Sequence, residues 1–313
     1  MTWLIWRQHR MQAATAAALL GALAILLAIT GVTMAHDYHS AMAACSPSSS
    51  ICGDLNLFRG DGAIMDLVNL TVAVPLLIGV FWGATSIGRE YDSGTNVLAW
   101  TQSVSRRRWL AAKVTTLLVT SLLAGIALSV MVTWWSKTMN AYHGNRFDPL
   151  QFDLQGLSPA AYTLFAAALG LLAGVAWRRI LPAIATTVGG FVLVRLSIEN
   201  WVRPHYETAV TVLDSGKGKG GAPAGAWSFS NDLVHNGHVV TGPIGPIQIP
   251  RCVHLVTRDQ MNACLAQSGY HFRSVYQPAG RYWTFQWIEA GIFVGISAML
   301  VAVAVFLVLR RDA

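Results

Sequence analysis

The sequence predicts an all-α polytopic membrane protein with six transmembrane helices and a small extracellular α+β cap between the fifth and the sixth. Three observations lead to this fold class. Charged residues make up only 12% of the 313 residues, about half the roughly 25% that is usual in soluble domains. Hydrophobic residues make up 54% and are gathered into long runs. The polar residues between the fifth and sixth runs form one long segment. This composition argues against a disordered chain, a coiled coil and a cytosolic enzyme.

Six apolar runs are each long enough to cross a bilayer core, which takes about 20 helical residues. In chain order they cover residues 13–34, 67–87, 110–135, 159–177, 181–202 and 283–309. Trp109, Trp177 and Trp201 lie at ends of these runs, where indole rings favour the headgroup layer. Pro75, inside the second run, is expected to bend its helix because the ring removes a backbone hydrogen bond.

Pairs of glycines four positions apart occur in three of the runs. Such pairs let two helix backbones approach closely. We expect them to serve packing within one subunit rather than contact between two copies. The pairs are Gly79 and Gly83, Gly170 and Gly174, and Gly291 and Gly295.

The distribution of Lys and Arg predicts the orientation. With the N-terminus inside, the inner segments are short and rich in basic residues, as over residues 106–108 and at Arg178 and Arg179. The outer segments are longer and more sparsely basic, and Arg203 is counted among their basic residues. The positive-inside rule then predicts a multi-pass plasma-membrane protein with both termini in the cytoplasm. Because the net charge of +7 is explained by topology, we expect no nucleic-acid partner.

All four cysteines lie in segments predicted to be outside. Disulfides persist in oxidising compartments. We therefore expect one bond between Cys45 and Cys52 and another between Cys252 and Cys264, with free thiols as the alternative. The cysteine spacings differ from those of common zinc motifs, so no metal site is predicted.

The polar segment over residues 204–282 is predicted to form the extracellular cap. A Val- and Ile-rich stretch punctuated by prolines over residues 243–250 is expected to hold short edge strands. A capping-box pattern that begins at Thr257 predicts a helix, which Gly269 ends. Alternating aromatic and polar residues over 270–276 predict a strand.

The inner segment between the second and third runs, residues 88–108, is longer than a topological turn requires. Part of it has an amphipathic helical pattern in which Val97, Leu98 and Trp100 share an apolar face. A helix on the membrane surface is one interpretation. A docking element for a cytoplasmic partner is the other.

Three motifs in and beside this segment are Glu90-x3-Gly94-Thr95, Thr101-Gln102-Ser103-Val104-Ser105-Arg106, and Arg108-Trp109-Leu110 with Lys113. Together they resemble the coupling-loop signature of type-2 ATP-binding-cassette exporter permeases, and most closely the actinobacterial branch. Residues 3–10 resemble the amphipathic first helix of that branch, and residues 276–289 resemble its junction into the last span. The resemblance extends over nearly the whole chain and is weakest over residues 207–248.

The resemblance implies a permease subunit of an ATP-driven exporter that works as a dimer with separate ATPase subunits. A homodimer is preferred over a heterodimer. No catalytic residue or cofactor is expected on this chain, since it lacks the G-x-x-x-x-G-K-[ST] motif that cradles phosphates. ATP and Mg are expected on the partner ATPase. The residues expected to couple to that ATPase are Glu90, Tyr91, Gly94, Thr95, Gln102 and Arg106.

The chain is predicted to have four parts, of which some lie in the membrane lipid and the others on either side of it. They are a cytoplasmic amphipathic helix over residues 1–12, transmembrane helices one to five over 13–203 with the coupling loop at 88–108, the extracellular cap over 204–282, and the sixth helix with a cytoplasmic tail over 283–313.

A cluster of charges is predicted within the spans at Arg195, Glu199 and Glu289. Intramembrane charges are costly and are usually paired or functional. Arg195 and Glu199 share one helix face at i, i+4, and all three residues fall in the outer half of the membrane. We expect Arg195 to pair with Glu199 or Glu289. The cluster either gates a pathway at its outer end or ties the fifth and sixth helices together.

Two other classes of membrane protein remain as alternatives. A secondary transporter driven by an ion gradient requires midplane charges and inverted repeats, and the sequence shows no clear repeat. A receptor or assembly protein that uses the cap would not require the long inner segment. The sequence leaves the cargo open among drugs, peptide antibiotics and lipids.

Overall fold

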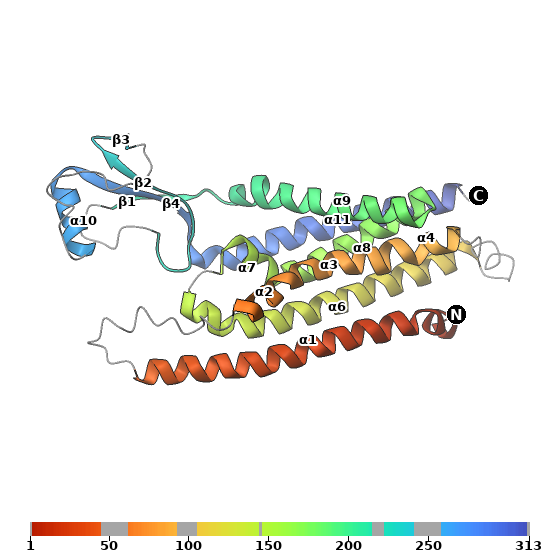
Figure 1. The fold of residues 1–313 in the computed structure, drawn as a ribbon. Coiled ribbons are helices and arrows are strands. Elements are labelled where there is room, and N and C mark those ends of the chain that lie inside the picture. The colour runs from red at the N-terminus through yellow and green to blue at the C-terminus, as the bar shows by residue number, and fades with distance from the viewer. Residues whose placement is uncertain are drawn as a thin grey trace.

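The computed structural model describes residues 2–44, 62–92, 105–143, 146–214, 222–240 and 258–311. Long helices run side by side along one axis, and a small β-sheet lies at one end of them (Figure 1). The start of α1 (Thr2–Ala44) and the end of α11 (Tyr282–Arg311) both lie at the opposite end. We call these two ends of the molecule the sheet end and the terminal end.

Six helical stretches of the described chain are long and apolar enough to cross a membrane, which confirms the predicted fold class. They are Ala17–Ala44, Gly62–Ala84, Arg107–Ala141, Ser158–Trp177, Ile180–His205 and Ala279–Arg310. An even number of crossings agrees with both termini lying at one end (Figure 1). Residues 2–12 continue without a break into the first crossing, since both belong to α1.

The second crossing is built from several short helical pieces. They are α2 (Gly62–Leu70), the 3-10 turn η2 (Thr71–Ala73), α3 (Val74–Ile78), the π-helical turn η3 (Gly79–Ala84) and α4 (Thr85–Asp92). Pro75 is in the first turn of α3 and has no N–H to donate to the carbonyl of Thr71. The N–H of Val74 bonds to that carbonyl instead, in a 3-10 pattern. The predicted irregularity at Pro75 is thus present as a change of helix type.

α8 (Ser158–Trp177) is the centre of the bundle and packs against α3, η3, α6 (Arg106–His143), α9 (Ile180–Ser197) and α11. Two of the glycine pairs allow this packing. A Cβ added to Gly79 would lie 2.6 Å from the carbonyl oxygen of Ala166, and one added to Gly174 would lie 2.9 Å from that of Ala84. The prediction of packing within one subunit is confirmed for these pairs. A Cβ at Gly291 or Gly295 would meet nothing within 4 Å in the described structure.

The sheet contains four antiparallel strands in the order β1-β4-β2-β3. The strands are β1 (Val210–Asp214), β2 (Trp227–His235), β3 (His238–Val239) and β4 (Tyr270–Gln277), with α10 (Arg258–Gln267) before β4. The predicted strand over 270–276 is therefore present. So is the predicted helix before it, which Gly269 follows with a left-handed φ of +80°. The proline-punctuated stretch over 243–250 lies outside the described residues.

The disulfide predictions fall mostly on segments that the structure does not describe. Cys45, Cys52 and Cys252 lie outside the described residues, whereas Cys264 lies on α10. The described part of the chain contains no free cysteine. Both predicted pairings therefore stay predictions.

Candidate functional site

A network of buried charges lies among the helices on the side of the sheet end. Its centre is Arg203, in the 3-10 turn η5 (Arg203–His205), with Asp153 from α7 (Pro149–Leu154) and Glu289 from α11. Arg203 is 1% exposed, Asp153 2% and Glu289 1%. The Nη2 atom of Arg203 lies 2.5 Å from Oδ1 of Asp153 and 2.6 Å from Oε1 of Glu289, and its Nε lies 2.8 Å from Oε2 of Glu289. One guanidinium therefore joins two carboxylates, using the forked geometry that favours strong ion pairs.

Three further side chains complete this charge network. Arg195 on α9 donates from Nη2 to Oδ2 of Asp153. The hydroxyl of Tyr162 on α8 lies 2.8 Å from Oδ1 of Asp153 and also hydrogen-bonds Oε1 of Glu289. The hydroxyl of Tyr206 donates to Oε2 of Glu289 at 3.1 Å. The network consequently ties α7, α8, α9 and α11 together at one depth of the bundle.

Local helix geometry brings Arg203 to the same side as Arg195. Residues eight positions apart on a regular α-helix are offset by about 80° around its axis. Between them the chain forms a π-helical turn, η4 (Ile198–Val202), which adds about one residue to a turn. Eight positions then correspond to about seven α-helical positions and an offset of only about 20°. The π turn therefore lets both guanidinium groups reach Asp153.

Gln286 on α11 positions the α7–α8 junction, where Asp153 is located. Its Oε1 accepts hydrogen bonds from the backbone N–H groups of Leu157 and Ser158 at 2.8 and 3.0 Å. Its Nε2 donates to the carbonyl of Phe152 at 3.0 Å. The first N–H groups of a helix lack partners within the helix, so Gln286 supplies the cap that α8 needs and fixes the residue next to Asp153.

An aromatic cluster borders the charge network. Its buried members are Phe147, Phe152, Tyr282 and Phe285, and Tyr206 and Trp227 pack against them. The guanidinium of Arg203 lies 4.4 Å above the ring of Phe152, an arrangement that favours a cation. Burial, followed by the nearby charge of Glu289, raises the pKa of Tyr206 well above its ordinary value. Its hydroxyl therefore remains a neutral donor to Glu289.

The charge network corrects two predictions and adds new members to a third, the cluster of Arg195, Glu199 and Glu289. The predicted pairing of Arg195 with Glu199 or Glu289 is wrong, because Arg195 pairs with Asp153. Arg203, which was counted with the outer basic residues, is instead buried at the end of the fifth crossing. Arg195 and Glu289 come together through Asp153 and Arg203, and Glu199 is partly buried on η4, between Arg195 and Arg203 in the chain.

Asp153, Arg203 and Tyr162 were not predicted as site residues. Asp153 and Arg203 fall just outside the apolar runs, where charged residues are usually solvated. The sequence holds one hint, and it concerns Arg203. This residue directly follows the fifth run and continues the four-residue spacing of Arg195 and Glu199. Tyr162 carries no signal, since a tyrosine near the end of a span is common.

Three of the six predicted coupling residues flank a gap in the described chain at the terminal end. Glu90 and Tyr91 lie in the last turn of α4, and Arg106 is the first residue of α6. Both helix ends lie at the terminal end of the bundle (Figure 1). Gly94, Thr95 and Gln102 lie outside the described residues.

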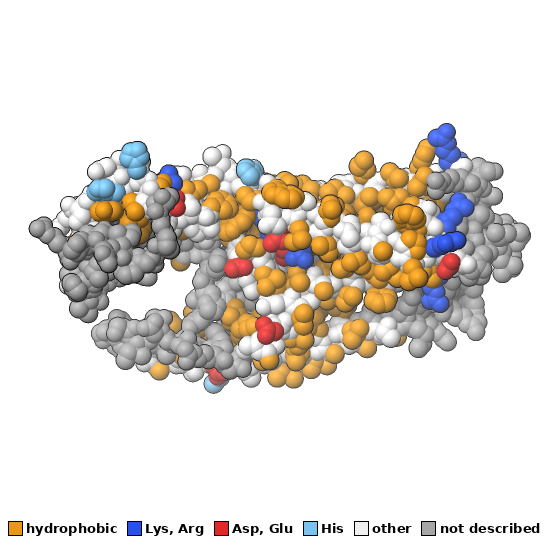
Figure 2. Space-filling model, turned by 45° about the horizontal axis from the view of Figure 1, so that its top comes forward, with side chains coloured by type: hydrophobic (Ala, Val, Ile, Leu, Met, Phe, Trp, Pro, Cys, Tyr) orange, Lys and Arg blue, Asp and Glu red, His pale blue; other side chains and the backbone are white. Residues whose placement is uncertain are grey.

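Exposed cations gather at the same end. Figure 2 shows blue side chains concentrated there, while apolar side chains cover much of the helical part of this face. The exposed arginines of this end include Arg89, Arg107, Arg108, Arg178 and Arg310. This distribution resembles the basic side of a membrane protein.

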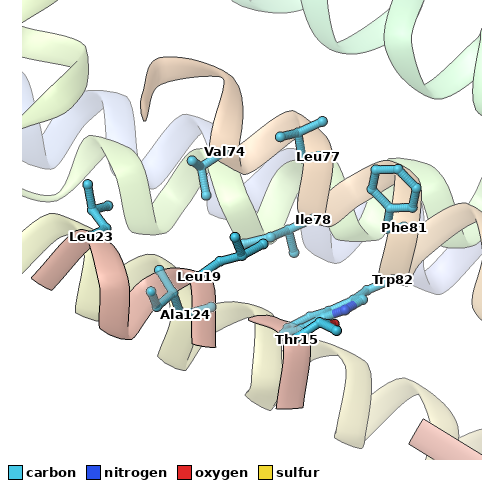
Figure 3. Close-up of a pocket in the computed structure, with 10 residues that line it drawn as sticks. Thr15, Leu19, Leu23, Val74, Leu77, Ile78, Phe81, Trp82 and Ala124 are labelled. Carbon is cyan, nitrogen blue, oxygen red and sulfur yellow. The ribbon is translucent and has the colours of Figure 1, made fainter. Parts of the chain in front are cut away.

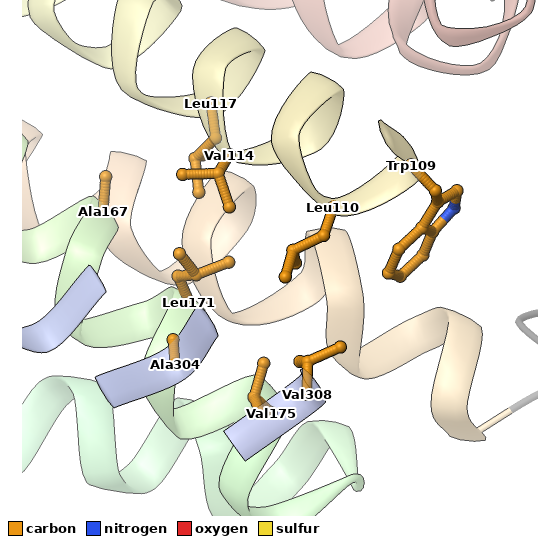
Figure 4. Close-up of a cluster of buried hydrophobic side chains, with 9 residues drawn as sticks. All are labelled: Trp109, Leu110, Val114, Leu117, Ala167, Leu171, Val175, Ala304 and Val308. Atoms are coloured by element: carbon orange, nitrogen blue, oxygen red, sulfur yellow. The ribbon is translucent and has the colours of Figure 1, made fainter. Parts of the chain in front are cut away.

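Lys113 joins the two helices that flank the coupling segment. Its buried Nζ on α6 donates to the backbone carbonyl of Ser86 on α4 at 3.2 Å and lies 5.0 Å from the centre of the Trp109 ring. Trp109 belongs to a buried apolar cluster that joins α6, α8 and α11 (Figure 4). Its members are Trp109, Leu110, Val114, Leu117, Ala167, Leu171, Val175, Ala304 and Val308. The start of α6 is thus firmly packed into the bundle.

Comparison with known proteins identifies the family. No curated protein and no solved structure matches the chain. Residues 17–203, more than half of the chain, match the family described as ABC-2 membrane transporter related, and the chain belongs to that family.

Proposed function

We propose that this chain is the permease subunit of an ATP-driven exporter and couples to separate ATPase subunits through residues 88–108. The family match over residues 17–203 carries the proposal. It supports a transmembrane component of an ABC transporter, and the six crossings agree with that role. ATP and Mg would bind the partner subunit.

The exposed arginines support an orientation with the terminal end in the cytoplasm. The positive-inside rule places short, basic segments on that side. The sheet would then face the outside, and both termini would lie beside the ATPase. In this orientation the end of α4, which carries Glu90 and Tyr91, and the start of α6, at Arg106, lie on the cytoplasmic side.

The packing at the terminal end offers a route for coupling. A force on α4 reaches α6 directly through Lys113 and Ser86. The apolar cluster around Leu171 carries the displacement on to α8 and α11. These last two helices also hold Tyr162 and Glu289 of the charge network. We assign the network to holding the outer ends of the helices together, because its central ions are almost fully buried and mutually paired.

A homodimer is the assembly that we propose. Much of the face of α11 that carries Gly291 remains open, with Trp287 and Met299 exposed on the same helix. Small residues allow close approach of two membrane helices, so this face suits a second copy. A secondary transporter and a receptor that uses the sheet domain remain the competing functions.

Co-purification tests the proposed function. Affinity-tagged chain expressed with candidate ATPase subunits should retain one of them, and Glu90→Ala should lose it. Glu207→Ala, which removes a carboxylate that pairs with Arg281 near the sheet, is the matched control and should retain the ATPase. A chain that purifies alone and transports without an ATPase would overturn the proposal.

A further inference from the structure

An apolar pocket lies between the first, second and third crossings at the half of the bundle nearer the terminal end (Figure 3). Its volume is about 330 Å³, within the range of small-ligand sites. Leucines of α1 form one wall, α3 and η3 form the other, and Ala124 of α6 also lines it. The lining residues are Thr15, Leu19, Leu20, Leu23, Val74, Leu77, Ile78, Phe81, Trp82 and Ala124.

α1 packs closely against α6 near the sheet end and borders the pocket toward the terminal end. Near the sheet end, the indole Nε1 of Trp135 on α6 donates to Oγ1 of Thr30 at 3.0 Å. Beside this bond, a Cβ added to Gly31 would lie 2.9 Å from the Trp134 ring, so the two helices approach closely there. Toward the terminal end, α1 and η3 are separated by the pocket (Figure 3). The contact at Trp135 therefore holds one half of α1 while the other half borders a cavity.

The surroundings of the pocket indicate what fills it. The side chains at its rim are apolar and open, with Leu19 72% and Phe81 60% exposed. Because they belong to membrane crossings, the medium outside the rim is the hydrocarbon of the bilayer. From Thr15 to Leu23 the α1 wall rises about 12 Å, close to half of a bilayer core of about 30 Å. The acyl chain of a lipid in one leaflet spans a comparable length.

Cations lie on the side where the headgroup of such a chain would be. Arg89, seven residues beyond Trp82 along the second crossing, is exposed at the terminal end. At about 1.5 Å per residue it lies about 10 Å beyond the pocket. Arg107 and Arg108 are exposed at the same end. A phosphate at the membrane surface would meet positive charge there.

We propose that this pocket binds the acyl chain of a phospholipid from the leaflet at the terminal end. The bound chain fills the space between α1 and η3 and completes the packing of the first crossing. This proposal requires that the protein spans a membrane, but it does not require coupling to an ATPase. The lipid site and the proposed function can therefore fail separately.

Site-specific photo-crosslinking tests this proposal. The photoreactive residue p-benzoylphenylalanine is placed at position 19, at the rim of the pocket, and the full chain is extracted from membranes and purified in detergent before irradiation. The matched control carries the same residue at position 193 on α9, where Leu193 is 67% exposed and lies outside the pocket. Detergent is expected to replace lipid at an open surface, whereas an acyl chain held in the pocket should remain bound. Mass spectrometry should therefore find a phospholipid adduct at position 19 and none at position 193.

A second substitution ties the adduct to the pocket. Ala124→Phe places a ring among the lining residues and should abolish the adduct at position 19. If the substituted chain does not fold, Val74→Phe at another lining position replaces it in the same assay. The proposal is overturned if position 19 yields no phospholipid adduct, if the adduct survives a folded pocket-filling substitution, or if position 19 crosslinks to a second copy of the chain.

Discussion

The two ends of the bundle are held together by opposite kinds of contact. At the terminal end, α6, α8 and α11 meet through a buried cluster made up of apolar side chains (Figure 4). Toward the sheet end, α7, α9 and α11 meet through ion pairs centred on Arg203, and Tyr162 joins α8 to them by hydrogen bonds. Lipid is as apolar as leucine, so an apolar cluster in a membrane contributes mainly packing. A charge in that environment requires its partner. The terminal end therefore depends on close packing, whereas the charge network depends on its central cation, Arg203.

The largest effect is expected from Arg203→Ala. It leaves the carboxylates of Asp153 and Glu289 buried without their central cation. Breaking a buried pair by removing one partner costs about 3–5 kcal/mol. Thermal unfolding of the purified chain in detergent should show a large fall in melting temperature. The control Arg273→Ala removes a more exposed pair with Asp232 and should change the melting temperature little. Equal shifts for the two variants would show that burial adds nothing to the cost of losing the cation.

A smaller effect is expected from Leu171→Ala in the apolar cluster. The side chain is fully buried between α6 and α11, and its truncation leaves a cavity. Leu→Ala changes in cores cost about 2–5 kcal/mol, and we expect the lower end of that range because lipid is as apolar as leucine. The same melting experiment measures it, with Leu193→Ala on the open face of α9 as the control. A loss as large as that of Arg203→Ala would remove the contrast between the two ends.

Arg195→Ala is expected to cost about 1.5–3 kcal/mol, since it removes one charged hydrogen bond to Asp153. Asp153 keeps Arg203 as its partner at 2.5 Å, so the network should survive. Transport by a reconstituted complex should continue at a rate near that of the unchanged chain. A complex that assembles but leaks or stops would instead indicate that the network acts as a gate.

The smallest effect concerns an ion pair on the sheet. Hydrogen bonds from Arg273 and Ser230 lower the pKa of Asp232. The stabilising contribution is therefore present above the unfolded pKa, about 3.9, and is lost as the pH falls through the lower folded value. Amide hydrogen exchange on β2 and β4 should show a small loss of protection below about pH 4. In Asp232→Asn this loss should be absent. A strong effect at neutral pH would contradict the assignment.

Local patterns were sufficient to predict the elements that depend on them. The apolar runs predicted the crossings, Gly269 predicted the end of α10, and two of the glycine pairs predicted close packing on α8. The charge network was only partly predictable. Its assembly depends on the π-helical turn at Ile198–Val202, and no residue type in the sequence predicts such a turn.

Hydropathy along the chain is enough to predict six membrane crossings and a small α+β domain between the last two. The reason is that a bilayer accepts only long apolar helices. Which charges are buried together depends instead on how the helices pack. Asp153 and Arg203 lie outside the apolar runs, yet α7 and the widened end of the fifth crossing fold them inward against Glu289. Partner choice among charges depends on three-dimensional proximity, and that proximity arises from helices that are far apart along the chain.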